Sequence, residues 1–248
     1  MATATASAAI REELGVKPPD ELVSWLNVLI YGEPGVGKTW LAGTAEDDKA
    51  TSPVLFLDVE GGVTTLRKRK NLDVVAVRSI DQIVKVHASL RKDPDYYKTV
   101  VVDSLTELQK LDMREIMREA SARNPNQDED VPSMREWGKS GERIRRIVRA
   151  YRDLPMNTIF TAHTIVDKDA NNATNYAPSL PGKLRAELPG FLDIVGYMYT
   201  FIEDGVTIRR VQFAKTKTVI AKDRTDELGD YLDNTTIPEM WKTIHNAK

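Results

Sequence analysis

Short apolar runs rich in β-branched residues alternate along the chain with longer segments in which apolar residues recur at helical spacing. The first pattern is typical of buried strands and the second of amphipathic helices. The predicted strands are residues 26–31, 53–58, 73–77, 98–104 and 157–163, and the predicted helices are residues 81–91, 105–120 and 135–152. This alternation predicts an α/β fold with a mainly parallel sheet covered by helices on both faces.

The chain after residue 163 follows a different pattern. Residues 164–181 are rich in Asn and show no periodicity, which predicts a long loop. The other elements expected here are a short helix after Gly182, a C-terminal β-hairpin of residues 195–202 and 206–213 turned at Glu203-Asp204-Gly205, a basic stretch at 215–224 and a helix at 238–246.

These patterns divide the chain into three parts. Residues 1–24 are small and polar and contain Pro18-Pro19, so we predict a flexible N-terminal arm with a short helical turn at residues 10–14. Residues 25–225 carry the alternating strands and helices and form the predicted core. Residues 226–248 are expected to be a C-terminal tail with a short helix.

The first predicted strand leads directly into Gly32-Glu33-Pro34-Gly35-Val36-Gly37-Lys38-Thr39, which has the spacing G-x-x-x-x-G-K-[ST], and Trp40 then begins a helical pattern. A glycine loop between a strand and a helix turns backbone N–H groups toward one point, where they surround phosphate oxygens. We therefore predict that residues 32–40 bind ATP, with Lys38 at the β- and γ-phosphates and Thr39 as a ligand of Mg²⁺.

Hydrolysis also requires an acid that helps to hold Mg²⁺ and a group that orients the attacking water. Asp103 ends a β-branched run and is predicted to be the metal-binding Walker B acid. Many AAA-type ATPases carry the water-activating acid directly after it, but here Ser104 follows. Two acids at the end of the second predicted strand remain as candidates, Glu60, which we favour, and Asp58.

Composition excludes several classes of function. The chain of 248 residues has no cysteine, so neither a disulfide framework nor a thiolate metal site is possible. No window approaches the roughly 18 apolar residues of a membrane span, and no secretory signal is visible, so we expect a cytoplasmic protein without a membrane partner. The formal net charge of -2 implies that any nucleic acid must be held by a local basic surface.

The segments Phe56-Leu57-Asp58-Val59-Glu60, Val100-Val101-Val102-Asp103-Ser104 and Phe160-Thr161-Ala162-His163 resemble the core of RecA-type recombinases. The resemblance implies that Glu60 activates water and that Asp103 is the Walker B acid. In that family the later strand ends in a polar residue, usually Gln, that senses the γ-phosphate. His163 stands at that position and is the expected sensor.

The resemblance extends to Ala221-Lys222-Asp223-Arg224. RecA-like ATPases commonly carry a Lys-x-Lys or Lys-x-Arg pair on a late strand, which reaches the γ-phosphate of the adjacent subunit. Cations at positions i and i+2 of a strand point the same way and suit one shared anion. Lys222 and Arg224 are therefore expected to act in trans within a homo-oligomeric ring or filament.

The layout, a RecA-like core without an accessory DNA-binding domain, is most similar to the small phage ATPases of the Sak type. That resemblance implies single-strand annealing or recombination, a possible single-strand-binding protein as partner, and the host cytoplasm as location. The segment after His163 would correspond to the loop that binds single-stranded DNA. The residues expected to contact DNA are Lys168, Asn171, Asn172, Tyr176, Lys183 and Arg185.

Two other classes share the same motifs. A helicase-loading, packaging or DnaB-type motor would use the same core to translocate or remodel its partner. A nucleotide switch or kinase would use the same loop, although a kinase needs a second substrate pocket, usually under an arginine-rich lid, and no such lid is visible. The sequence does not separate an annealing protein from a motor.

Overall fold

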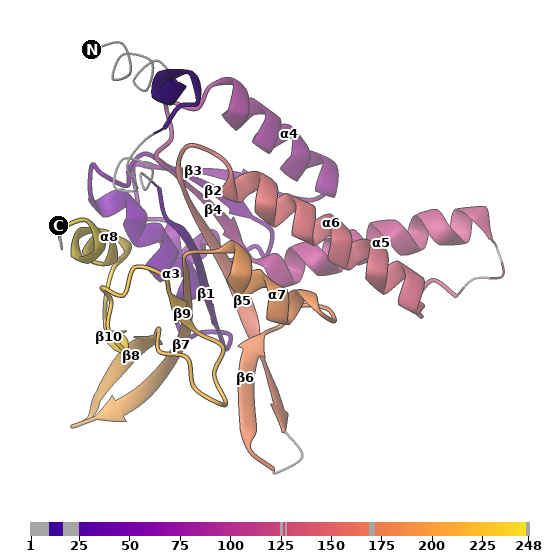
Figure 1. Cartoon of the computed structure of the whole chain (residues 1–248). Coiled ribbons are helices and arrows are strands. Elements are labelled where there is room, and N and C mark those ends of the chain that lie inside the picture. The colour runs from indigo at the N-terminus through magenta and orange to yellow at the C-terminus, as the bar shows by residue number, and fades with distance from the viewer. Residues whose placement is uncertain (1–9, 17–24, 125, 127, 169–171, 247–248) are drawn as a thin grey trace.

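The computed structural model describes residues 10–16, 25–124, 126, 128–168 and 172–246. Within them one sheet of ten strands runs through the molecule, with helices on both sides (Figure 1). The strands are β1 (Asn27–Gly32), β2 (Val54–Asp58), β3 (Leu72–Ala76), β4 (Thr99–Asp103), β5 (Asn157–Lys168), β6 (Thr174–Pro178), β7 (Ile194–Glu203), β8 (Val206–Gln212), β9 (Lys222–Asp223) and β10 (Tyr231–Asp233). Their order is β10-β8-β7-β1-β5-β4-β2-β3, while β6 pairs with β5 and β9 with β7.

The centre of the sheet is parallel. β1 pairs in parallel with β5 on one side and with β7 on the other. The parallel part continues from β5 to β4, then to β2 and β3. Beyond β7 the sheet is extended by the antiparallel strands β8 and β10. The predicted α/β fold with a mainly parallel sheet and a C-terminal β-hairpin is therefore confirmed.

The helices divide between the two faces of the sheet. They are α3 (Lys38–Gly43), α4 (Ile80–Lys92), α5 (Leu105–Arg123), α6 (Met134–Arg152), α7 (Leu184–Phe191) and α8 (Ile237–Asn246), with the 3-10 turns η1 (Thr44–Asp47) and η2 (Val63–Leu66). α4, α5, α6 and α7 pack on one face, and α3 and α8 on the other. No helix of the described residues has the length and apolar character needed to cross a membrane.

The strands have long apolar runs because both of their faces are buried. Along β1, Leu29 and Tyr31 pack with α4 to α7, and the alternate residues Val28 and Ile30 pack with α3 and α8. Side chains of a strand point alternately to the two faces, so each covered face requires its own set of apolar positions. The continuous apolar run of β1 in the sequence therefore reflects burial on both faces of the sheet.

Capping boxes fix the starts of two helices, α4 and α6. Ser79 accepts a hydrogen bond from the N–H of Gln82 and forms a capping box at α4, as its position before the predicted helix suggested. Ser133 and Glu136 form the equivalent box at α6. Each box satisfies backbone N–H groups that have no partner within the helix.

The prediction of a long loop at residues 164–181 is wrong. β5 continues to Lys168 and pairs antiparallel with β6, with Thr164 opposite Pro178 and Lys168 opposite Thr174. The hairpin escaped the sequence analysis because it extends beyond the core, where only part of each strand is covered and no apolar alternation is needed. Hydrogen bonds between the two backbones hold it instead.

Two hairpins therefore extend past the carboxyl edge of the parallel strands. Gly32, the last residue of β1, lies opposite His163 in β5 and Met198 in β7. Because both of these strands continue well beyond that register, the β5–β6 and β7–β8 hairpins project on the same side as the glycine loop (Figure 1).

The segment after residue 225 was predicted as a tail with a short helix. The helix is present as α8, and the described part of the segment is integrated into the fold. β10 joins the main sheet, and α8 buries Ile237, Met240 and Ile244 against the face that carries α3. At the other end of the chain, residues 10–13 form the expected helical turn, while the rest of the predicted arm, residues 1–9 and 17–24, lies outside the described residues.

Candidate active site

The glycine loop closes between β1 and α3 in a shape that only glycine permits at several positions. Gly35 and Gly37 have φ angles of 82° and 108°, which side chains rarely adopt. A Cβ atom on Gly32 would lie 2.2 Å from the carbonyl oxygen of Met198 in the neighbouring strand β7. The loop is thus shaped both by its own turn and by the strand beside it.

The glycine loop itself holds the side chain of Lys38 in place. Its side chain is buried, and Nζ donates hydrogen bonds to the carbonyl oxygens of Gly32, at 3.0 Å, and Glu33, at 2.9 Å. Burial lowers the pKa of Lys38, and the nearby carboxylates of Glu60 and Asp103 oppose that shift. An arriving polyphosphate would offer this ammonium group stronger acceptors than the two carbonyls.

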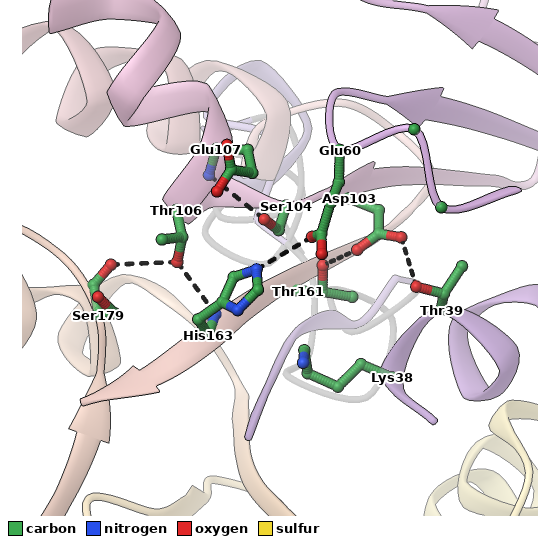
Figure 2. A network of polar contacts seen from close by, with 12 residues as sticks. Lys38, Thr39, Glu60, Asp103, Ser104, Thr106, Glu107, Thr161, His163 and Ser179 are labelled. Carbon is green, nitrogen blue, oxygen red and sulfur yellow. Dashed lines mark hydrogen bonds and ion pairs between the residues drawn. The ribbon is translucent and has the colours of Figure 1, made fainter. Parts of the chain in front are cut away.

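The predicted metal-binding residues are in direct contact. Thr39 Oγ1 donates to Asp103 Oδ2 at 2.7 Å, and Thr161 Oγ1 donates to the other carboxylate oxygen (Figure 2). Asp103 is 1% exposed, and this burial raises its pKa. A buried carboxylate turned toward the hydroxyl of the glycine loop is a site where a cation would relieve the cost of burial.

These oxygens fit Mg²⁺. The described residues contain no cluster of three or more His, Cys, Asp or Glu side chains able to enclose a metal ion. Mg²⁺ at nucleotide sites uses few protein oxygens and takes its remaining ligands from phosphate and water. Thr39 and Asp103 would hold the ion in this way, and the ion would neutralise charge on the phosphates.

The two candidate acids after β2 have different environments. Asp58 is 3% exposed, and its Oδ1 accepts hydrogen bonds from the N–H groups of Gly61, at 2.7 Å, and Gly62, at 3.1 Å. Its carboxylate thereby stabilises the turn. Glu60 has a side chain that is 34% exposed, and its N–H donates to the carbonyl oxygen of Asp103, which carries it over the end of β4. Of the two, Glu60 is the acid available to a water molecule.

Glu60 contacts His163 directly. Glu60 Oε2 lies 3.1 Å from His163 Nε2, and the two side chains point toward each other across the end of β4 (Figure 2). The hydrogen bond from His163 is the main cause of a lowered pKa at Glu60, and it is assisted by Ser104 and by the charge of Lys38. The sequence predicted a role for each residue but not their contact, which depends on β2 and β5 both flanking β4.

A chain of hydrogen bonds joins this pair to the base of the β5–β6 hairpin. The N–H of His163 donates to Thr106 Oγ1 at 3.0 Å, and that hydroxyl donates to the carbonyl oxygen of Ser179 at 3.1 Å. The N–H of Ser179 in turn donates to the carbonyl oxygen of His163 at 2.8 Å. The residue that contacts the candidate catalytic acid is therefore also fixed to the point where the hairpin leaves the core (Figure 2).

Comparison with known proteins agrees with this site. A family model described as an AAA domain, AAA_24, matches residues 25–225. The chain belongs to the AAA_24 family. It is accordingly a P-loop ATPase domain of the AAA type, for which nucleotide binding, typically with Mg²⁺, is the expected property.

Two solved structures are similar over most of the chain. A KaiC-like protein from Pyrococcus horikoshii OT3 is 15% identical, with 77% of this chain and 79% of that chain covered and a TM-score of 0.43. The flagellar accessory protein FlaH from Methanocaldococcus jannaschii is 12% identical, with 80% and 79% covered and a TM-score of 0.42. No match was found among curated proteins.

In this AAA_24 domain the position after the Walker B acid serves the fold. Ser104 Oγ accepts a hydrogen bond from the N–H of Glu107 and caps α5. A glutamate there would lose this cap and would have to enter a fully buried position. The candidate water-activating acid instead comes from the neighbouring strand, as Glu60.

Lys222 and Arg224 have partners within their own subunit. Lys222 Nζ donates to the carbonyl oxygens of Pro189 and Leu192, both at 2.8 Å, and burial lowers its pKa. Arg224 forms an ion pair with Asp193 at 2.6 Å. Both lie where β9 meets the start of β7, at the edge of the sheet opposite the glycine loop. This placement gives them a structural role that the sequence analysis did not foresee.

The basic stretch of residues 215–224 contains a second pair with the same spacing, Lys215 and Lys217, which the sequence analysis did not single out. Lys215 and Lys217 are exposed, and neither side chain has a hydrogen-bond or ion-pair partner among the described residues. The loop that carries them is joined to β6, because the N–H of Tyr176 donates to the carbonyl oxygen of Thr218 at 2.6 Å (Figure 1). It therefore lies on the carboxyl side of the sheet. The Lys-x-Lys spacing of Lys215 and Lys217 matches the pattern that the sequence analysis applied to Lys222 and Arg224.

The residues expected to contact DNA have unequal surroundings. The ring of Tyr176 stacks on Tyr197, with ring centroids 5.0 Å apart, and Arg185 pairs with Asp167 at 2.7 Å. Both are thus engaged within the chain. Lys168, Asn172 and Lys183 are exposed and belong to or flank the hairpin, and Asn171 lies outside the described residues. Their contact with DNA stays a prediction.

The last residue of the predicted nucleotide site is also accessible. Trp40, in the first turn of α3, is 43% exposed, and the guanidinium of Arg69 lies 6.0 Å from its ring. Glu33, Pro34 and Gly35 are exposed at the top of the loop, whereas Val36 is buried in the core. The loop thus presents its backbone outward while one side chain anchors it.

Proposed function

We propose that this protein hydrolyses ATP with Mg²⁺ and uses the reaction to change the conformation of the β5–β6 hairpin. The observation that carries the proposal is the contact between Glu60 and His163, 3.1 Å apart, beside the Thr39–Asp103 pair. Glu60 is the general base that orients the attacking water, and Lys38 neutralises charge on the phosphates. Thr39 and Asp103 hold Mg²⁺, which supplies further positive charge to the polyphosphate.

The position of His163 would depend on the bound nucleotide and would in turn affect the β5–β6 hairpin. A γ-phosphate next to Glu60 competes for the hydrogen bond that His163 gives to this acid. A movement of His163 would be transmitted through Thr106 to Ser179, since these residues are hydrogen-bonded in sequence. Binding and hydrolysis would then favour different positions of the hairpin.

We further propose that the hairpin binds single-stranded DNA and that the protein acts in strand annealing or recombination as a homo-oligomer, as the RecA resemblance implies. The exposed cations Lys168 and Lys183 support a backbone contact. The trans-acting role moves to Lys215 and Lys217, whose side chains have no partner among the described residues, because Lys222 and Arg224 make contacts within their own subunit.

ATP turnover measured with and without single-stranded DNA tests the proposed partner. Turnover is expected to rise severalfold with DNA, because a bound strand would favour the hairpin position that hydrolysis requires. Duplex DNA and an unrelated polyanion serve as controls for charge alone. Turnover that is indifferent to DNA would contradict the annealing proposal and favour a motor that remodels proteins, or a nucleotide switch.

The variant His163→Ala is expected to shift the acid limb of the pH–rate profile to higher pH. His163 stabilises the charged form of Glu60 and lowers its pKa, so removal of the ring lets that pKa rise. Glu60 would then become protonated, and inactive as a base, at a higher pH than in the wild type. His163→Gln, which can still donate a hydrogen bond, should show a smaller shift. An unchanged acid limb in His163→Ala would contradict the coupling.

A further inference from the structure

One arginine beside the glycine loop has a side chain without a partner in the described part of the chain. Arg209 lies on β8 with an exposed side chain that makes no hydrogen bond or ion pair among the described residues. Its neighbour Arg210 is fully engaged, paired with Asp233 through two hydrogen bonds of 2.7 Å and stacked on Tyr231. The difference marks Arg209 as a cation available to a ligand.

The backbone at Arg209 is fixed although its side chain is free. Its N–H donates to the side-chain oxygen of Asn234 at 3.0 Å, and its carbonyl oxygen accepts from the N–H of Asn234 at 2.7 Å. Asn234 takes the left-handed conformation, with φ of 49°, to close this pair. The position from which Arg209 extends is therefore set by the fold.

The side chain of Arg209 lies along the glycine loop. A Cβ atom built on Gly37 would be 3.2 Å from Nε and 3.4 Å from Cδ of Arg209. Gly37 directly precedes Lys38, so the guanidinium lies next to the residues whose backbone surrounds the phosphates. An unpaired guanidinium at a phosphate cradle has the charge and the forked donors to bind a phosphate oxygen.

The order of the strands indicates which phosphate it would reach. Glu60 follows β2, Asp103 ends β4 and His163 lies in β5, and these three strands are all on one side of β1. The γ-phosphate belongs beside them, because they activate the water and hold the metal. Arg209 approaches from the opposite side of β1, through β7 and β8. It is therefore directed at the part of the nucleotide that lies away from the γ-phosphate.

We propose that Arg209 binds the diphosphate part common to ADP and ATP and so contributes to the affinity for both nucleotides, without a role in the hydrolytic step. The inference rests on the proposed nucleotide site and extends it by a residue outside the glycine-loop motif. It also makes nucleotide affinity dependent on the β7–β8 hairpin, which carries Arg209, and on the turn at Asn234 that fixes it.

The test compares equilibrium binding of ADP and ATP to the wild type, Arg209→Ala and Arg209→Lys. The alanine variant is expected to bind both nucleotides roughly tenfold more weakly, the loss of one hydrogen bond to a charged group. Its KM for ATP should rise by a similar factor with kcat unchanged, and the lysine variant should recover part of the affinity. Thr207→Ala, at an exposed position two residues earlier in β8, is the matched control and should bind as the wild type does.

Equal affinity of the wild type and Arg209→Ala for ADP would overturn the inference, as would a loss confined to ATP or an equal loss in Thr207→Ala. Thermal unfolding of each variant separates a loss of ligand contact from a loss of fold. A wild-type protein that binds neither nucleotide would instead overturn the proposed function itself, and the role of Arg209 with it. The two failures are thus distinguishable.

Discussion

Replacement of Glu60 by Gln is expected to reduce ATP turnover by on the order of 10²- to 10⁴-fold, the usual contribution of a general base. The amide keeps the size of the side chain and an oxygen that can accept from His163, but it cannot take a proton from water. Nucleotide binding should persist, because Lys38, Thr39 and Asp103 are unchanged. Turnover and equilibrium binding of ATP, measured on the same preparation, check both parts.

Asp58→Asn is the matched control for this substitution. It makes the same chemical change two residues away, on an acid whose oxygen accepts from Gly61 and Gly62. The asparagine retains an acceptor for these N–H groups, so turnover should fall far less than in Glu60→Gln. If Asp58→Asn were the inactive variant and Glu60→Gln retained wild-type turnover, the assignment of the base would be wrong.

The double variant Lys215→Ala/Lys217→Ala is expected to lose turnover by on the order of 10³-fold, the lower part of the range for a cation supplied by a neighbouring subunit. Mixing it with Glu60→Gln subunits should restore part of the activity. The Glu60→Gln subunit would supply its intact lysines to a site in which Glu60 is intact. Turnover measured at several mixing ratios, together with the molar mass of the assembly, checks this result.

Lys222→Ala is expected to behave differently from the Lys215→Ala/Lys217→Ala variant, because it should lower stability. Lys222 donates to two backbone carbonyls of its own subunit, so its removal is expected to lower the free energy of unfolding by about 1–3 kcal/mol. Its defect should not be relieved by mixing with Glu60→Gln. Rescue of Lys222→Ala, without rescue of the Lys215/Lys217 variant, would return the trans-acting role to Lys222 and Arg224.

The local parts of the site follow from the sequence because each is built within a few residues. The glycine loop needs only its own spacing between a strand and a helix, and Asp103 needs only to end a buried strand. Glu60 could be named as a candidate for the same reason, although the choice against Asp58 required the contacts of both carboxylates. The cap at Ser79 also follows from its position directly before a helical pattern.

Some features of the fold were not predicted from the sequence. Outside the covered sheet the apolar pattern disappears, so the β5–β6 hairpin resembled a loop. The helix expected at residues 238–246 is present as α8, but the short strand β10 before it was not predicted. The trans-acting role of Lys222 and Arg224 was predicted from their spacing together with the RecA resemblance. Their partners within the subunit lie at the end of α7 and in the connection from α7 to β7, some thirty residues earlier in the chain, and no local pattern identifies them.

By itself the sequence determined that this protein is an α/β nucleotide-binding domain, and it named the residues at the ends of the strands that carry the chemistry. Only the tertiary structure decided which of them meet. The order β1-β5-β4-β2 brings Glu60 to His163, and the strands β7 and β8 bring Arg209 to Gly37. The apolar residues of a strand indicate that it is buried. Which strands lie next to it in the sheet depends on packing across the whole domain.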